Sequence, residues 1–420
     1  MANFRFLHAA DIHLDSPLHG LARYEGVPLD EVRGATRVAF DKMIQFALDE
    51  RVDFVVIAGD LFDGDWKDMG TGLYFAHAMR RLTKAGIPAF VLAGNHDAAS
   101  VLTRSLPWPD KVSVFSSKKP QTFTLPEIGV ALHGQSFPTQ HVHEDLAARY
   151  PAPESGVFNI GVLHTALTGA EGHAPYAPCT VQALQAKGYD YWALGHVHDY
   201  ARHSEQPPII FPGNLQGRNI RETGAKGAVL VEVRDRAVVD IRFAPLDVVR
   251  WARVRADCTG ADTQAAVHGA IRQALASAHA READGLPLIV RVQLDGETPL
   301  AGALKDGAAV LRDEVRALAA AIAPDIWLEK LSFHLRLPSA EVSTAESIPD
   351  DLLALLQEAQ ASEELAALLA EDLKPFLNGR PASTDDAPDD LSAAAARADW
   401  TALLDAAVSA LPSRLGGGEG

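Results

Sequence analysis

The segment Ala89–Asp97 reads AFVLAGNHD and places an apolar run directly before a glycine and three polar residues. Runs of about four to eight residues rich in Val, Ile, Leu and Phe are typical of buried strands. The glycine permits a sharp turn, after which Asn95, His96 and Asp97 offer side chains suited to metal binding or acid–base chemistry. Taken alone, the segment fits an ordinary turn as well as it fits a reactive site.

Four more apolar runs end at a polar cluster in the same way. They are Phe4 to His8 before Asp11 and His13, Phe54 to Ala58 before Gly59, Asp60 and Asp63, Asn159 to Leu163 before His164, and Tyr191 to Leu194 before Gly195, His196 and His198. The runs alternate with helical patterns at 30–50 and 68–85, which predicts an α/β layered domain. Ligands collect at the carboxyl ends of strands in such folds. Taken alone, Asp11 and His13 also fit a polar strand end, Gly59 and Asp60 fit a turn with a capping aspartate, and His164 fits a core histidine with its hydrogen bonds satisfied.

Beyond Trp251 the pattern changes to strand, helix, strand, helix, strand, and it continues to Leu337. This order predicts a small α+β cap domain. The expected organisation is an α/β domain over 1–249, a cap domain over 250–338, a polar linker over 339–349, an Ala- and Leu-rich helical region over 350–412 and a disordered tail over 413–420.

Composition limits the class of protein. No apolar run approaches the roughly 18 residues of a membrane span, and the first residues lack a secretory signal. Cys179 and Cys258 are the two cysteines, which excludes a disulfide framework, so we expect a cytoplasmic protein with no membrane association. The net charge of −17 is unusual for an enzyme of nucleic acids, but residues 339–420 hold 16 acidic and 4 basic residues, a net of −12. Charge therefore neither supports nor excludes a nucleic-acid substrate.

In chain order the motifs read D-x-H, G-D-x-x-D, G-N-H-D, H and G-H-x-H, and this series resembles the calcineurin-like metallophosphoesterases. The resemblance implies a β-sandwich flanked by helices and a centre of two divalent ions that share an anionic bridge. By the family pattern, one ion takes Asp11, His13, Asp60 and His198, and the other takes Asp60, Asn95, His164 and His196. Such nitrogen and oxygen ligands suit manganese, iron or zinc, and the resemblance favours Mn²⁺.

The same resemblance gives His96 the role of a catalytic histidine that contacts the phosphate or protonates the leaving oxygen. Asp97 would then orient the His96 ring, with a cap of the following helix as the alternative. Asp63 departs from the archaeal and eukaryotic relatives, which carry a histidine in the matching place, so its role stays open. The pair His141 and His143 has H-x-H spacing but follows no apolar run, and we expect it at the surface.

Three further stretches narrow the resemblance to the SbcD and YhaO group of DNA repair exonucleases: ADIHLDSPLHGL at 10–21, YAPCTVQAL at 176–184 and FPGNLQGRNIRETGAKG at 211–227. They imply a Mn²⁺-dependent exonuclease on DNA ends, 3′ to 5′, with single-strand endonuclease activity as an addition. Arg218, Arg221 and Lys226 become candidate contacts to the DNA backbone, with an ordinary solvated loop as the alternative.

The implied partners are DNA and a coiled-coil ATPase like SbcC or YhaN that docks on the region 350–412, with a homodimer as a further option. The alternative for the leucine-rich segment 351–377 is a helical hairpin folded on the chain's own cap domain. Two other functions use the same residues. One is a phosphodiesterase or phosphatase for a small nucleotide, and the other is a mainly regulatory subunit of an ATPase complex.

Overall fold

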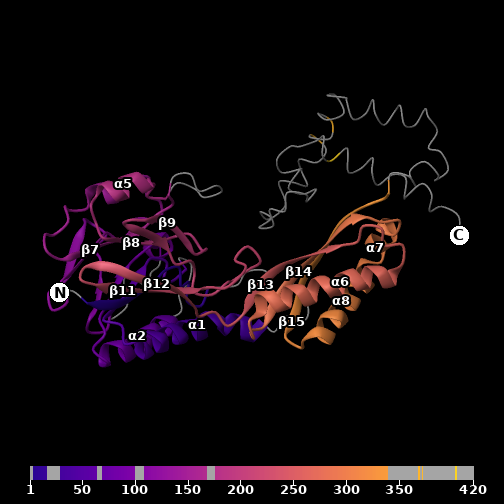
Figure 1. Cartoon of the computed structure of the whole chain (residues 1–420), viewed down its shortest axis with the longest axis horizontal. Coiled ribbons are helices and arrows are strands. Elements are labelled where there is room, and N and C mark those ends of the chain that lie inside the picture. The colour runs from indigo at the N-terminus through magenta and orange to yellow at the C-terminus, as the bar shows by residue number, and fades with distance from the viewer. Residues whose placement is uncertain are drawn as a thin grey trace. The chain divides into compact units, whose positions relative to one another are not determined.

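The computed structural model describes residues 3–16, 29–63, 69–99, 108–167 and 176–338, together with positions 368, 371 and 403. The chain divides into two compact units, and Figure 1 labels several of their helices and strands. The larger comprises Met1–Ala256, Ala270–Gln293 and Arg312–Ser332, and the smaller comprises Asp257–Gly269, Leu294–Leu311 and Phe333–Gly420. Among the described residues, no helix combines the length and the apolar character that a membrane crossing requires.

Two six-stranded sheets organise the described residues up to Pro245. The first has the order β12-β11-β1-β2-β3-β4, and the second has the order β5-β6-β7-β8-β10-β9. The strands are β1 Phe4–Ala9, β2 Phe54–Ala58, β3 Ala89–Leu92, β4 Val112–Val114, β5 Gln121–Leu125, β6 Val130–Gly134, β7 Phe158–His164, β8 Tyr191–Gly195, β9 Ala201–Glu205, β10 Pro208–Phe211, β11 Gly227–Arg234 and β12 Ala237–Pro245. Strands β1 to β4 are parallel to one another, as are β6, β7, β8 and β10. The five apolar runs predicted as strands are β1, β2, β3, β7 and β8, which confirms the α/β expectation.

Successive side chains along a strand point to opposite faces of the sheet, so one set lies between the two sheets and the other set packs against helices. Phe4, Phe6 and Phe54 lie in the core between the sheets, where the rings of Phe6 and Phe54 stack at 5.0 Å. Leu7 and Val55, which have the opposite parity, pack against the helices on the other face of the first sheet. The helices of this part are α1 Leu29–Asp49, α2 Met69–Lys84, α3 Asn95–Ala99, the 3-10 turn Ala147–Arg149 and α5 Val181–Ala186.

The remaining described residues form a three-stranded sheet with the order β13-β14-β15. Its elements are β13 Arg250–Asp257, α6 Gln264–Ala278, the π-helical turn His279–Ala283, β14 Leu288–Glu297, α7 Ala301–Asp306, α8 Ala308–Ile322 and β15 Ile326–Arg336. The predicted order of strands and helices is therefore found, except that Gly307 separates two helices where one was expected. Residues of this sheet fall in both compact units, so the predicted boundary near 250 stays a prediction. The linker, helical region and tail predicted for 339–420 lie outside the described residues, apart from three positions.

Candidate metal centre

The polar clusters predicted at the strand ends lie together. β1, β2 and β3 are parallel neighbours in one sheet and β7 and β8 in the other, so the carboxyl ends of each set share an edge. The two edges are joined, because the amide of His196 donates to both carboxylate oxygens of Asp11, at 3.1 and 2.9 Å. The side chains gathered here are Asp11, His13, Asp60, Asp63, Asn95, His96, His164, His196 and His198.

Four of these residues have a backbone conformation that residues other than glycine seldom adopt. The φ angles are 49° at Asp11, 45° at His13, 49° at Asp60 and 107° at His196. A residue in such a conformation costs of order 1 to 3 kcal/mol and persists where the surrounding structure holds it. Strained positions of this kind cluster at functional sites, and here all four are predicted metal ligands.

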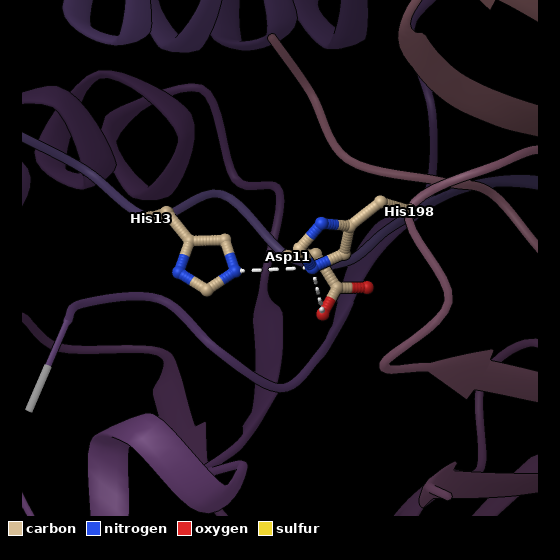
Figure 2. A group of neighbouring side chains, drawn as sticks. All are labelled: Asp11, His13 and His198. Atoms are coloured by element: carbon tan, nitrogen blue, oxygen red, sulfur yellow. Dashed lines mark hydrogen bonds and ion pairs between the residues drawn. The ribbon is translucent and has the colours of Figure 1, made fainter. Parts of the chain in front are cut away.

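Asp11, His13 and His198 form the first group of convergent ligand atoms (Figure 2). The Nε2 atoms of His13 and His198 are 3.3 Å apart, and His198 Nε2 lies 3.8 Å from Asp11 Oδ1. Burial lowers the pKa of His13 to about 4, and the charge of Arg218 adds to the shift. The His13 ring is therefore neutral near pH 7 and can offer a lone pair.

A carboxylate fixes the second nitrogen of each of these two rings. His13 Nδ1 donates to Asp63 Oδ1 at 2.6 Å, and His198 Nδ1 donates to Glu222 Oε1 at 2.8 Å. With the proton on Nδ1, each ring turns its Nε2 lone pair toward the other, an unfavourable contact that a cation between them relieves. Two imidazoles and a carboxylate are also a donor set that suits a divalent transition metal. The residues present therefore fit a metal ion.

Asp60, His164 and His196 form the second group. His164 Nε2 lies 2.9 Å from Asn95 Oδ1 and 3.4 Å from Asp60 Oδ2, while its Nδ1 donates to the carbonyl of Ala58 at 3.0 Å. Burial opposes a charge on His164, but the Asp60 carboxylate outweighs it and raises the pKa of His164 to about 9. A metal ion that binds this group takes the place of the proton on His164.

Asp60 lies between the two groups. Its Oδ2 is 4.0 Å from His13 Nε2 and 3.4 Å from His164 Nε2, and its Oδ1 accepts from the His96 amide at 3.0 Å. Although burial disfavours the ionised form, the neighbouring histidines, His164 foremost, hold the pKa of Asp60 below its usual range. One ionised carboxylate within reach of both groups has the position of a bridging ligand. The structure thus places the other six predicted metal ligands in the two groups that Asp60 adjoins.

Two glycines of the motifs allow this close approach. A Cβ on Gly94 would lie 2.3 Å from Asp60 Oδ1, and a Cβ on Gly195 would lie 1.9 Å from the carbonyl oxygen of Ala58. Both distances are shorter than any contact a side chain can make, so a larger residue would displace the Asp60 carboxylate or the end of β2. The glycines serve packing around the site.

His96 lies at the rim of the site. Its side chain is 42% exposed, whereas those of His13 and His164 are buried. His96 Nδ1 is 3.4 Å from Asp63 Oδ1, and its ring meets that of His13 edge to face, with the centroids 5.1 Å apart. An exposed imidazole beside a buried metal group can reach a bound substrate. His96 also converges with His13 and Asp63 as a third group of possible ligand atoms, so its separation from the metal ligands stays a prediction.

Asp97 does not orient His96, contrary to the sequence-based expectation. It is buried, and its Oδ2 accepts from the amides of Gly94 and Leu61, both at 3.0 Å, while its Oδ1 accepts from Phe62 at 2.9 Å. The bond to the amide three residues earlier is one half of a helix capping box, so the capping alternative is the correct one. Asp63 takes the place beside His96 that was expected of Asp97.

The predicted backbone contacts lie in the loop 217–226, and two of the three are occupied by protein groups. Lys226 is 3% exposed and donates to the carbonyl of His198 at 2.7 Å and to Asp199 at 2.6 Å. The Arg218 side chain is 15% exposed and pairs with Glu222 at 2.9 Å. A direct role for these two cations in binding phosphate is therefore not supported, and the solvated-loop alternative also fails. Arg221 is exposed, and its role stays a prediction.

Glu222 was not among the residues predicted for the site. A histidine that binds metal commonly donates its other ring nitrogen to a carboxylate, so a partner for His198 could be expected. That rule cannot choose among the 55 acidic residues of the chain, because the choice depends on which segments meet in the folded structure.

Comparison with known proteins supports the same kind of site. The model of the calcineurin-like phosphoesterase family matches residues 4–200, and a model described as metallophosphoesterase YhaO, middle domain, matches 251–336. The uncharacterized metallophosphoesterase YhaO of Bacillus subtilis is 35% identical over 303 residues, which cover 71% of this chain and 73% of that protein. The DNA double-strand break repair protein Mre11 of Methanopyrus kandleri is 28% identical over 280 residues, which cover 59% of this chain and 58% of that protein.

Two solved structures are also similar to this chain. TT1561 of Thermus thermophilus matches 58% of this chain and 99% of its own, with a TM-score of 0.34 and 12% identity. A dimetal phosphatase from Danio rerio matches 57% of this chain and 99% of its own, with a TM-score of 0.35 and 13% identity.

Proposed function

The chain belongs to the calcineurin-like metallophosphoesterase family, and on that premise we propose that it is a metal-dependent exonuclease that hydrolyses phosphodiester bonds in DNA. The observation that carries the proposal is the pair of ligand groups that share Asp60, with the exposed imidazole of His96 at their rim. The choice of DNA as the substrate rests on the 28% identity to an Mre11 repair protein over 280 residues. The proposed polarity is 3′ to 5′, with single-strand endonuclease activity as an addition.

Members of this family bind divalent metal ions, and the two groups can hold one ion each. Bound there, such ions would neutralise phosphate charge and supply an activated water as the nucleophile at neutral pH. Asp60 supplies the shared negative charge, and the neutral imidazoles supply the terminal ligands. We propose Mn²⁺ as the ion, since nitrogen and oxygen ligands without a thiolate suit it, as they also suit iron or zinc.

His96 performs the proton transfer in this proposal. When the bond between phosphorus and the departing sugar oxygen breaks, that oxygen takes a proton from the exposed edge of the His96 ring. Asp63, with Oδ1 3.4 Å from His96 Nδ1, holds the ring so that Nε2 faces the substrate. Because Asp63 also accepts from His13 at 2.6 Å, one carboxylate aligns a metal ligand and the catalytic histidine together.

A phosphodiesterase for a small nucleotide is the second candidate, and one observation favours it. Arg218 and Lys226 are bound to protein groups, so the site offers fewer free cations to a long phosphate backbone than the sequence suggested. A mainly regulatory subunit of an ATPase complex is a weaker alternative, because the complete set of ligands would have no use there.

One assay separates these functions. With Mn²⁺, we expect the purified protein to shorten end-labelled duplex and single-stranded DNA stepwise and to leave a cyclic nucleotide intact. The control is the same preparation carrying Asp60→Asn, which excludes a contaminating nuclease. Hydrolysis of the cyclic nucleotide without cleavage of either DNA would establish the second candidate instead, and cleavage of neither substrate would favour the regulatory one.

We also propose that a coiled-coil ATPase like SbcC or YhaN binds the region 350–412, of which the structure describes positions 368, 371 and 403. The support is the pattern of leucines in that region together with the resemblance of the chain to SbcD-type nucleases. A chain truncated after Pro338 is expected to cleave short DNA with Mn²⁺ as the full chain does, but to lose co-purification with the ATPase. Unchanged affinity of the truncated chain for the ATPase would refute the docking role.

A further inference from the structure

The loop 217–226 contacts His198 at three points. Glu222 Oε1 accepts from the ring at Nδ1 at 2.8 Å, Lys226 Nζ donates to the backbone carbonyl at 2.7 Å, and a terminal nitrogen of Arg218 lies 3.4 Å from Nδ1. The contacts of Glu222 and Arg218 fix the His198 ring, and the contact of Lys226 fixes the His198 backbone. The loop therefore determines where the Nε2 atom of His198, a candidate metal ligand, points.

Glu222 is itself held by a full set of donors. Its Oε2 accepts from the Arg218 amide at 2.7 Å and from Asn214 Nδ2 at 2.9 Å, and its Oε1 accepts from an Arg218 guanidinium nitrogen at 2.9 Å in addition to His198. The residue is buried. A buried carboxylate with this many donors has one orientation, so it can fix the tautomer and the angle of the ring that it contacts.

Arg218 extends the arrangement to the other imidazole of the first ligand group. One terminal nitrogen of its guanidinium pairs with Glu222 and another lies 3.8 Å from Asp63 Oδ1, the carboxylate that accepts from His13. One planar cation thus stands between the two carboxylates that orient the two histidines. The fork geometry of arginine permits this, whereas a lysine ammonium would serve one carboxylate at a time.

We infer that Glu222 and Arg218 are positioning residues for the ion held by Asp11, His13 and His198, and that they leave the ion held by Asn95, His164 and His196 unaffected. Glu222 fixes His198, and Arg218 aligns Glu222 with Asp63. The inference rests on the two-ion centre of the proposed function but not on its substrate, so a metal titration without DNA tests it separately.

The substitution Glu222→Gln keeps the shape and inverts the hydrogen bonding. Two donors, the Arg218 amide and Asn214, meet Oε2, whereas one guanidinium nitrogen of Arg218 donates to Oε1 beside His198. The amide oxygen of glutamine therefore faces the Arg218 amide and Asn214, and its NH₂ group faces His198 Nδ1. His198 then accepts at Nδ1 and carries its proton on Nε2, where it blocks the metal. Loss of a carboxylate that orients a ligand costs about 10- to 100-fold in metal affinity.

Titration of the metal-free protein with Mn²⁺ by calorimetry measures the result. We expect Glu222→Gln to bind one ion as the unsubstituted chain does and the other about 10- to 100-fold more weakly. Nitrogen NMR of histidine-labelled, metal-free protein should show the proton of His198 moved from Nδ1 to Nε2. The matched control is Glu205→Gln, because Glu205 pairs with Arg202 at the surface and is 78% exposed; both affinities should stay unchanged.

A second variant keeps the test independent of how well the first folds. Arg218→Lys retains Glu222 and the positive charge but loses the link to Asp63, so it should weaken the same ion by a smaller factor and leave the tautomer of His198 in place. Two unchanged affinities in Glu222→Gln, or equal weakening of both ions in either variant at an unchanged melting temperature, would overturn the inference. So would an Arg218→Lys variant that binds both ions normally and loses affinity for DNA, since Arg218 would then contact the substrate.

Discussion

Replacing Asp60 by asparagine is expected to weaken both metal ions together and to lower phosphodiester hydrolysis by at least about 1,000-fold. The bridge must supply negative charge to two cations, and a neutral amide cannot; Lewis-acid stabilisation is worth several kcal/mol, and each factor of ten in rate corresponds to about 1.4 kcal/mol. Asparagine retains an oxygen that can accept from the His96 amide, as Asp60 Oδ1 does at 3.0 Å, so the surrounding loop keeps its hydrogen bond.

Calorimetric titration with Mn²⁺ and a rate measurement on the same DNA substrate check this expectation. The control is Asp240→Asn, which changes an exposed aspartate on the strand β12 in the same way and should bind two ions with normal affinity. If Asp60→Asn loses one ion and holds the other at full affinity, Asp60 is a terminal ligand and the two ligand groups do not share it.

The strands that carry the site could be predicted because a short apolar run in the sequence marks each of them. β2 reads FVVIA and is buried along its whole length, and a strand that is covered on both faces needs such a run. The polar residue that follows each run then falls at a carboxyl end by necessity. Strands such as β9, which reads ARHSE and lies at the edge of its sheet, are partly exposed and carry no such run, so their pairing depends on the rest of the fold.

The partners of the site residues could not be predicted from spacing. Asp97 follows His96 directly, but both lie in α3, where consecutive side chains point about 100° apart around the axis, so Asp97 faces the buried loop after β2. Asp63 reaches His96 and His13 although 33 and 50 residues separate it from them in the sequence. Nearness in the chain suggested the wrong carboxylate because the hydrogen bonds of this site connect the ends of different strands.

Charge was misread in the loop 217–226 for a related reason. A cluster of basic residues in a glycine-rich stretch is typical of a solvated surface or of a phosphate contact. Here Glu222 is buried among them and pairs with Arg218, while Lys226 reaches a backbone carbonyl of the metal centre. A buried carboxylate needs a cationic partner in the interior, because an unpaired buried charge costs several kcal/mol. The basic residues therefore support the site from within.

Replacing His96 by asparagine is expected to lower DNA hydrolysis by about 100- to 10,000-fold while both ions stay bound. The ring is exposed at the rim and lies outside both the group of Asp11, His13 and His198 and the group of Asp60, His164 and His196, so in the proposed mechanism its loss removes a proton donor and no ligand of either ion. Asparagine keeps the backbone amide that donates to Asp60 Oδ1, so the bridge stays in place. Elemental analysis or calorimetry measures the ions, and a labelled oligonucleotide measures the rate.

The nature of the leaving group decides what His96 contributes. If it protonates the departing oxygen, a nitrophenyl ester of thymidine phosphate, whose leaving group needs no proton, should lose far less rate in His96→Asn than DNA does. Equal losses on both substrates would show that His96 positions the phosphate, and the loss of an ion would make it a ligand. The matched control is His143→Asn, since His143 is an exposed histidine outside the site and its replacement should change neither the rate nor the number of ions.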